Sequence, residues 1–258
     1  MSDKLAENNR KKTNRIYIFC ALLFCFFAII IYSFVFPNPR GGRPMKFQII
    51  PVTPFQQNCT LMWDEKTKKA AVVDPGGDIP RIVGAIEKQG VTLEKVFVTH
   101  GHLDHCGAAK ELADKFGVPI EGPNQADEYL LQDLDKSQTR MWGLPAGKPF
   151  TPNRWLKQGD TVTVGEETLN VYDCPGHSPG HVAFFHAPSK VAITGDVLFA
   201  GSVGRTDLPN GSFEKLENSI RTNLYKLGDD VQFIPGHGPV SSIGKERKTN
   251  PYVPDRGR

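Results

Sequence analysis

Cysteine is scarce in this sequence, with five residues in 258 and no Cys-x-x-Cys pair. Cys20 and Cys25 lie inside a long apolar run, and Cys59, Cys106 and Cys174 are scattered over the rest of the chain. This pattern excludes a disulfide framework, and the odd count indicates reduced thiols, which favours a cytoplasmic domain. We expect all five to be small buried hydrophobic side chains.

An excess of charge of one sign is also missing, since 31 Lys and Arg face 28 Asp and Glu. The basic excess is concentrated in residues 1–15, and the chain beyond residue 43 is mildly acidic. Because no basic stripe is present, we exclude a nucleic-acid partner. The hydrophobic content of 39% excludes a disordered chain and allows one large domain or two small ones.

Only one long hydrophobic run is present, at residues 16–36. Its length corresponds to roughly 31 Å of helix, so we expect a single transmembrane anchor. Pro37 ends the run without a small-residue cleavage site, and the more basic N-terminal flank would place the domain on the far side of the membrane. The alternative is that Met45 is the true start, which leaves a cytoplasmic protein without residues 1–44.

Outside the hydrophobic run, the sequence predicts a tail, a linker and one domain. Residues 1–15 form a basic tail, residues 37–44 (PNPRGGRP) a linker, and residues 45–258 one globular domain. Short apolar runs predict strands and amphipathic runs predict helices in alternation. Two packed sheets with helices outside satisfy this pattern. We expect helices at 77–90, 106–117, 126–134 and 213–227, and strands at 46–52, 59–63, 69–74, 95–100, 118–122, 161–164, 168–174, 181–187, 190–196 and 231–236.

Histidine is also sparse, with seven residues, but three of them fall within six positions. His100, His102, Asp104 and His105 lie in THGHLDH, between an expected buried strand and an expected helix. In extended chain the first two histidines point the same way, so both can bind one metal. Asp104 and His105 follow at the helix start, where they can reach a second metal. Imidazole and carboxylate ligands suit zinc, iron or manganese.

Three further sequence stretches can complete such a site. His177 in CPGHSPGH and His237 in PGHGP lie in Gly- and Pro-rich loops, and Asp196 ends an apolar strand. His181 is too close to His177 for both to reach the metals easily, so we expect it to support the site indirectly. His186, in FFHAPS, is interpreted as a structural histidine.

These motifs together resemble the metallo-β-lactamase superfamily over about Met45 to Val253. They most resemble the small type II glyoxalases, the hydroxyacylglutathione hydrolases; the matching stretches are THGHLDH, CPGHSPGHVAFF, GDVLFAGSVGRTD, FIPGHGP and the early Asp74-Pro75-Gly76. The resemblance implies an α/β fold, the αββα sandwich, with a dinuclear site. It implies that one metal binds His100, His102 and His177, that the other binds Asp104, His105 and His237, and that Asp196 bridges them.

The implied activity is hydrolysis of glutathione thioesters, such as S-D-lactoylglutathione to D-lactate and glutathione, by a metal-bridging hydroxide. Two divalent ions are expected per chain, zinc first, with iron or manganese as alternatives. Asp104 is expected to act in catalysis as a ligand, and Asp74 is either an orienter of a ligating histidine or a simple turn former. The partner is a small thioester, and the oligomeric state is open.

Two departures keep other functions open. Only 21 residues follow His237, so the long C-terminal helical region of type II glyoxalases is missing, and we expect residues 123–160, with Arg140, Met141 and Trp142, to replace part of the substrate pocket. The Gly204–Asp207 stretch (GRTD) resembles persulfide dioxygenases, which use one iron. Arg205 is expected to meet a substrate carboxylate in either case, or else to pair with a neighbouring Asp.

If the protein is a persulfide dioxygenase, its iron is expected on His100, His177 and Asp196. A true β-lactamase is a third hypothesis. A fourth is a non-enzyme with a purely structural metal. Seven candidate ligands for two metals leave open coordination positions, which argues for catalysis and against this fourth hypothesis.

Overall fold

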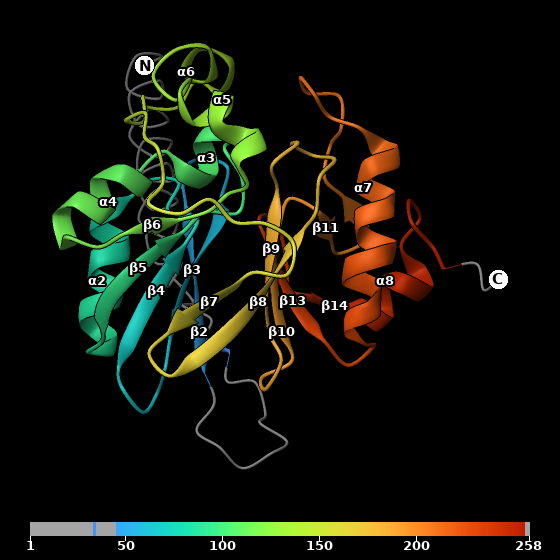
Figure 1. Cartoon of the computed structure of the whole chain (residues 1–258), viewed down its shortest axis with the longest axis horizontal. Helices are drawn as coiled ribbons and strands as arrows, with labels where there is room; N and C mark the ends of the chain where they lie inside the picture. The colour runs from blue at the N-terminus through green and yellow to red at the C-terminus, as the bar shows by residue number, and fades with distance from the viewer. Residues whose placement is uncertain (1–32, 35–44, 256–258) are drawn as a thin grey trace, which may run out of the picture. The chain divides into compact units, whose positions relative to one another are not determined.

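Two six-stranded sheets form the centre of the computed structural model, which describes residues 33–34 and 45–255 (Figure 1). The strands of the first sheet follow chain order. They are β1 (Ser33–Phe34), β2 (Lys46–Val52), β3 (Gln57–Trp63), β4 (Lys69–Val73), β5 (Thr92–Phe97) and β6 (Ile120–Glu121). The β4–β5 and β5–β6 pairs are parallel, and the others are antiparallel.

The second sheet is built from the C-terminal half of the chain. Its order is β14 (Ser241–Ser242), β13 (Gln232–Pro235), β10 (Val191–Gly195), β9 (Val182–His186), β8 (Glu167–Asp173) and β7 (Thr161–Val164). Only the β10–β13 pair is parallel. A small hairpin, β11 (Leu198–Phe199) with β12 (Ser202–Val203), follows β10.

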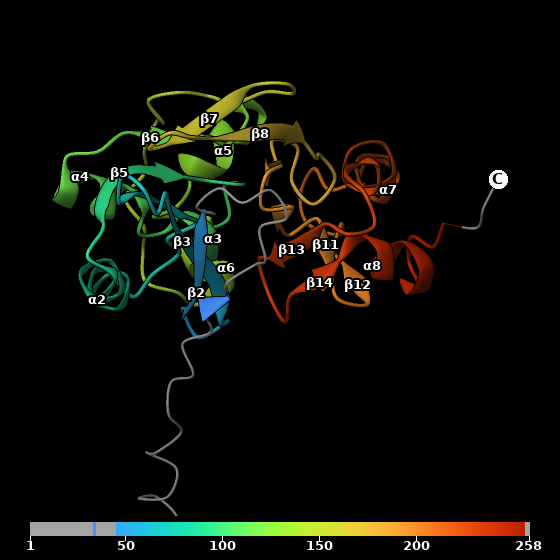
Figure 2. The same ribbon diagram turned by 90° about the horizontal axis from the view of Figure 1, so that it is seen from below.

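Helices cover the outer faces of both sheets. Helices α2 and α4 lie on the outside of the first sheet and α7 and α8 on the outside of the second, which the view from below also shows (Figure 2). Short helices α3, α5 and α6 lie at one end of the sheets (Figure 1). The bounds are α2 (Ile79–Gln89), α3 (Leu103–Cys106), α4 (Ala109–Phe116), η1 (Gln125–Asp127), α5 (Glu128–Leu131), α6 (Ser137–Trp142), α7 (Phe213–Ser219), η2 (Ile220–Leu224), η3 (Tyr225–Leu227) and α8 (Ile243–Thr249).

Three clusters of buried side chains hold these layers together. One joins the first sheet to its helices and includes Val72 and Ile82. Another joins the second sheet to α7 and α8 and includes Phe233 and Leu216. The third fills the space between the sheets. Apolar burial is the dominant favourable term in folding. Each cluster lies between two neighbouring layers, so three clusters join four layers in the order helices, sheet, sheet, helices. The αββα sandwich expected from the sequence is therefore confirmed.

The inter-sheet cluster makes a prediction about stability. Phe184 of β9 is fully buried and stacks on Phe97 of β5, with ring centroids 5.3 Å apart. Phe184→Ala is expected to lower the free energy of unfolding by about 3–5 kcal/mol, because it removes an aromatic ring and leaves a cavity between the sheets. Urea unfolding measures the change. Phe213→Ala, at a side chain that is 42% exposed, is the control and should cost much less; equal losses would contradict this account of the core.

Two residues of the run 16–36, where a transmembrane helix is expected, are described by the structure and form a strand instead. Ser33 and Phe34 form β1, paired antiparallel with Gln48 and Phe47 of β2, so their backbone groups bond to a neighbouring strand instead of within a helix. The rest of that run lies outside the described residues, as do the tail 1–15 and the linker 37–44. Within the part of the chain that the structure describes, no helix has the length and apolar character to cross a bilayer.

Candidate metal centre

Four of the candidate site residues lie just beyond the carboxyl ends of four strands. Asp74 follows β4, His100 lies just beyond β5, Asp196 follows β10 and His237 lies just beyond β13. Both β4–β5 and β10–β13 are parallel pairs, so each pair presents its carboxyl ends at the same sheet edge. The fifth segment is the loop between β8 and β9, which carries His177.

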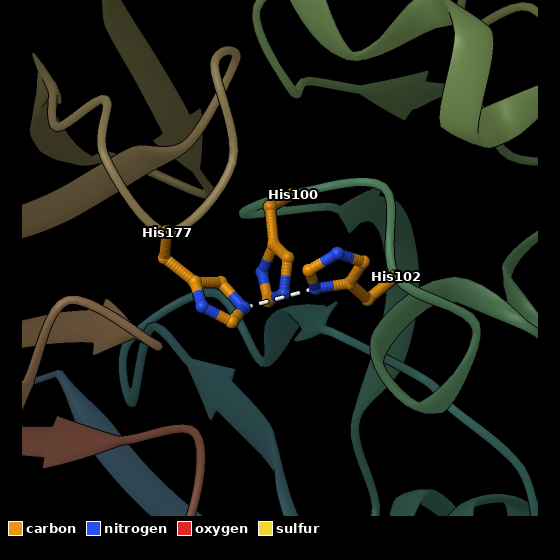
Figure 3. Close-up of side chains that lie close together, drawn as sticks. All are labelled: His100, His102 and His177. Atoms are coloured by element: carbon orange, nitrogen blue, oxygen red, sulfur yellow. Dashed lines mark hydrogen bonds between the residues drawn. The ribbon is translucent and has the colours of Figure 1, made fainter. Parts of the chain in front are cut away.

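A first group of ligand atoms comes from His100, His102 and His177. All three side chains are buried, and one nitrogen from each lies within 4.8 Å of the others. Nδ1 of His102 lies 2.9 Å from Nε2 of His177 (Figure 3). His102 immediately precedes α3, which lets the chain turn directly after it. The structure thus brings together the three histidines expected to share one metal.

A second group comes from Asp104, His105 and His237. Oδ2 of Asp104 lies 3.2 Å from Nε2 of His237 and 3.8 Å from Nε2 of His105. Asp104 and His105 are adjacent in α3, and His237 arrives from the loop after β13. One ligand atom from each lies within 4.8 Å of the others, as expected for a second metal.

Asp196 lies between the two groups. Its Oδ1 is 3.3 Å from Nε2 of His105, and its Oδ2 is 3.6 Å from Nε2 of His177 and 3.7 Å from Nε2 of His237. Gly236 makes room for it, since a Cβ there would lie 2.1 Å from Oδ1 of Asp196. One carboxylate therefore faces both groups, which is the placement a bridging ligand needs.

The donor atoms of this cluster fit metal ions. Nε2 of His100, Nε2 of His105 and Oδ1 of Asp196 are buried without a hydrogen-bond partner. Unpartnered buried polar atoms are costly, and a cation would satisfy all three. The described residues thus form a metal-binding centre of histidine and carboxylate, a donor set that zinc, iron and manganese all accept.

The protonation states of the first group suit this role. Burial lowers the pKa of His102 to about 3 and holds the pKa values of His100 and His177 below the ordinary value. All three imidazoles are neutral at pH 7 and keep a lone pair for a cation.

The second group carries charge. Burial raises the pKa of Asp104, but neighbouring His105 outweighs it and holds that pKa below its usual range. Burial lowers the pKa of His105, but Asp196 and Asp104 outweigh it and raise that pKa well above the ordinary value. Ionised carboxylates here attract positive charge, whether a proton on His105 or a bound cation.

Asp74 orients one of these histidines. Its Oδ2 lies 2.9 Å from Nδ1 of His105 and accepts a hydrogen bond from the Thr99 hydroxyl, and its Oδ1 accepts one from the Thr99 backbone N–H. Asp74 also falls in a third group of ligand atoms with His100 and His105. Because its oxygens already accept these bonds, we interpret Asp74 as a positioning residue that leaves Nε2 of His105 for the cluster.

Asp127, which the sequence analysis missed, joins the two histidine loops. Its Oδ2 accepts hydrogen bonds from the Gly101 N–H at 2.9 Å and the Ser178 hydroxyl at 2.7 Å, and its Oδ1 accepts one from the Gly180 N–H at 2.6 Å. Gly101 lies between His100 and His102, and Ser178 follows His177. Burial raises the pKa of Asp127 to about 6, although the three donors act to lower it.

Gln138 of α6 was also missed. Its Oε1 accepts a hydrogen bond from the Leu103 N–H, and its Nε2 donates to the carbonyls of Gly101 and Leu130. It therefore fixes the same loop as Asp127, and both residues belong to the segment 123–160.

The two remaining histidines lie outside the three groups. Nε2 of His181 accepts a hydrogen bond from the Asp196 N–H at 3.0 Å, and its ring stacks on that of His100 with centroids 4.6 Å apart. His181 therefore supports the cluster indirectly, as expected. His186 pairs with Ser189 and Glu167 within the second sheet.

Arg205 contributes through its backbone. Its carbonyl accepts a hydrogen bond from Nδ1 of His177 at 2.8 Å, which fixes the tautomer and leaves Nε2 unprotonated. Its exposed side chain donates two hydrogen bonds of 2.7 Å to Asp207. The arginine therefore makes the neighbouring ion pair that was the alternative to substrate binding.

A cavity of about 320 Å³ opens beside His102. Of the three residues expected to form a substrate wall, Met141 and Trp142 line this cavity and Arg140 does not. The ring of Trp142 lies 6.3 Å from that of His102, measured between centroids.

Four αββα layers with a histidine and carboxylate centre at one end define a metal-binding protein of the metallohydrolase class. The chain belongs to the metallo-beta-lactamase superfamily, whose family model matches residues 52–237. It is 46% identical over 210 residues to the hydroxyacylglutathione hydrolase GloC of Haemophilus influenzae, which covers 81% of this chain and 98% of that protein. Both the family and the nearest subgroup expected from the motifs are confirmed.

Three solved structures are similar in fold. The BLEG-1 B3 metallo-beta-lactamase has a TM-score of 0.75 at 32% identity, and TTHA1623 in a di-iron-bound form has 0.72 at 33%; each match covers 80% of this chain and 99% of the other. ETHE1 from Myxococcus xanthus has a TM-score of 0.67 at 26% identity, with coverage of 82% and 85%. The family match and the GloC relative support a metal-dependent hydrolase.

Proposed function

We propose that this protein hydrolyses glutathione thioesters, with S-D-lactoylglutathione giving D-lactate and glutathione, and that it does so with two divalent metal ions. The observation that carries the proposal is the presence of two separate three-residue ligand groups with Asp196 facing both. The similarity to hydroxyacylglutathione hydrolase GloC supports the substrate class. Zinc is the proposed metal; the similarity to a protein with a di-iron-bound form keeps iron as the alternative.

The chain's residues hold and orient this centre. His100, His102 and His177 would hold one ion, Asp104, His105 and His237 the other, and Asp196 would contact both. Two ions in such a site supply a water nucleophile at neutral pH and a polarised carbonyl. Hydrolysis joins the water oxygen to the thioester carbonyl carbon and breaks the C–S bond. The sulfur leaves as thiolate, which needs little acid assistance because a thiol pKa is about 8.5.

Two further residues hold the ligating histidines in their orientations. Arg205 fixes the tautomer of His177 through its carbonyl, and Asp74 fixes the ring of His105. Such partners orient ligands and raise their basicity. Asp104 would act in catalysis as a metal ligand, because a carboxylate that binds a metal is not free to act as a general base.

A second candidate function is persulfide dioxygenation with one iron on His100, His177 and Asp196. It is favoured by the GRTD stretch and by the similarity to ETHE1. This function does not explain the second ligand group. One ligand atom from each of Asp104, His105 and His237 lies within 4.8 Å of the others, the same limit that the first group meets. We therefore retain hydrolysis as the better-supported function.

Substitution of His177 tests the proposal. His177→Ala is expected to lower kcat/KM for S-D-lactoylglutathione by about 10³-fold or more, because it removes one of three ligands from the first group. Chelation of the unsubstituted protein should abolish thiol release, and added zinc should restore it. His186→Gln, at a histidine outside the cluster, should keep its activity. Undiminished hydrolysis by His177→Ala, or after complete metal removal, would refute the proposal.

A further inference from the structure

His237 is the most exposed of the seven candidate metal ligands. Its side chain is 28% exposed, whereas the next two, Asp104 and Asp196, are 13% and 12% exposed. It lies in a loop between Gly236 and Gly238, and glycine places little restriction on the backbone. The loop therefore does not by itself select one orientation of the imidazole, so contacts from neighbouring elements have to do so.

Asn58, near the start of β3, makes three hydrogen bonds to this loop. Its backbone N–H donates to the Gly236 carbonyl at 2.7 Å, and its side-chain Nδ2 donates to the carbonyls of Pro235 at 3.0 Å and Gly238 at 2.8 Å. The acceptors lie on both sides of His237 in the sequence. Asn58 is only 9% exposed, so water competes little for these bonds. One residue thus holds the loop before and after its ligand.

The loop packs directly against two other candidate ligands. A Cβ at Gly236 would lie 2.1 Å from Oδ1 of Asp196 and 2.6 Å from Cε1 of His105. The Gly236 N–H also donates to the Gly195 carbonyl at 2.8 Å. A shift of the loop therefore displaces His237 relative to both of these neighbouring ligands.

The turn before β3 makes a further contact with His237. The Phe55 carbonyl lies 3.2 Å from Nδ1 of His237, and because a carbonyl only accepts, Nδ1 is the donor and Nε2 is the nitrogen that faces Asp104. Thr53 and Gln56, at the two ends of the turn, have φ values of 61° and 53°. These values are unfavourable for residues other than glycine, above all for a β-branched threonine. The turn is thus held in a strained conformation that presents this carbonyl to His237.

We propose that Asn58 is a positioning residue for the second metal ion, because it holds the loop that carries His237 where its imidazole reaches the second ligand group. The inference rests on the proposed two-metal centre and adds the residue on which the second ion depends. Asn58 acts only through His237 and does not itself bind the metal or the substrate.

Competition with a chelator of known affinity tests this role on the full-length protein with zinc. The unsubstituted protein should bind two ions per chain. Asn58→Ala should weaken the binding of one ion by about 10–100-fold and leave the other unchanged, because only the loop that carries His237 loses its anchor. Unchanged affinity for both ions, or equal weakening of both, would overturn the inference. If the unsubstituted protein binds a single ion, the two-metal centre itself fails, and the inference with it.

Thiol release in excess zinc separates positioning from ligation. Asn58→Ala keeps every ligand, so saturating zinc should restore its thiol release to within severalfold of the unsubstituted protein. His237→Ala lacks a ligand and should not recover under the same conditions. A folded Asn58→Ala protein that stays inactive with two ions bound would contradict a role in positioning His237 for the metal.

Two further variants separate hydrogen bonding from packing and stability. Asn58→Leu fills the space but cannot donate, so it should lose affinity for the second ion as Asn58→Ala does; retained affinity would overturn the inference. Asn153→Ala is the matched control, because Asn153 also bonds to the backbone, accepting from the Ile120 N–H of β6 at 2.8 Å. It should bind both ions normally, and a loss equal to that of Asn58→Ala would show that metal affinity follows general stability instead.

Discussion

Asp104→Ala is expected to lower kcat/KM for thioester hydrolysis by about 10³-fold or more and to reduce the bound metal from two ions per chain to one. The physical reason is that Asp104 supplies the only carboxylate of the second ligand group besides the shared Asp196, and it lies 3.2 Å from His237. Steady-state thiol release and metal analysis on the same sample measure both effects.

The same substitution separates the two candidate functions. The iron of a persulfide dioxygenase would sit on His100, His177 and Asp196, a set that Asp104→Ala leaves complete. Asp114→Ala is the control, because Asp114 is an exposed carboxylate on α4, paired with Lys110, and should be silent. Full thiol release by the Asp104→Ala protein would refute the two-metal mechanism and leave the one-iron mechanism as the remaining candidate.

Asp127→Ala is expected to weaken metal binding by about 10–100-fold and to lower kcat/KM correspondingly, although Asp127 touches neither metal-ligand group. Its carboxylate is the shared acceptor for donors from the His100–His102 loop and the His177–His181 loop. Without it, the buried N–H groups of Gly101 and Gly180 lose their partner, and the two loops lose their common anchor. Competition with a metal chelator of known affinity measures the change.

A conservative replacement distinguishes positioning from simple loss of stability. Asp127→Asn keeps one side-chain oxygen as an acceptor and should recover part of the metal affinity, whereas a purely structural role would change unfolding without changing affinity. Asp135→Ala, at an exposed carboxylate between α5 and α6, serves as the control. Unaltered metal affinity in a folded Asp127→Ala protein would contradict the positioning role.

The seven candidate ligands were accessible from the sequence because they are local features. His100, His102, Asp104 and His105 lie within six residues, and His177, Asp196 and His237 each stand at a strand end or in a Gly- and Pro-rich loop. Spacing alone could not show that these segments meet. They meet because β4–β5 and β10–β13 are parallel pairs whose carboxyl ends face one location.

The residues that support these ligands could not be predicted from the sequence. Asp127 looked like an ordinary acidic residue in an expected helix at 126–134; the structure instead has η1 and α5 there, and α6 after them. Its importance comes entirely from tertiary hydrogen bonds to loops 26 and 53 residues away in sequence. Arg205 contacts His177 through a backbone carbonyl, which every residue possesses, so its side chain could not indicate this contact.

One parallel measurement tests the two-metal hydrolase most directly. On a single preparation of the full-length protein, metals per chain, thiol release from S-D-lactoylglutathione and O₂ consumption with glutathione persulfide would be determined together. A two-metal hydrolase would show about two metal ions per chain, hydrolysis that is lost on chelation, and no O₂ uptake. About one iron per chain with O₂ uptake and no hydrolysis would contradict it and assign the site to persulfide oxidation.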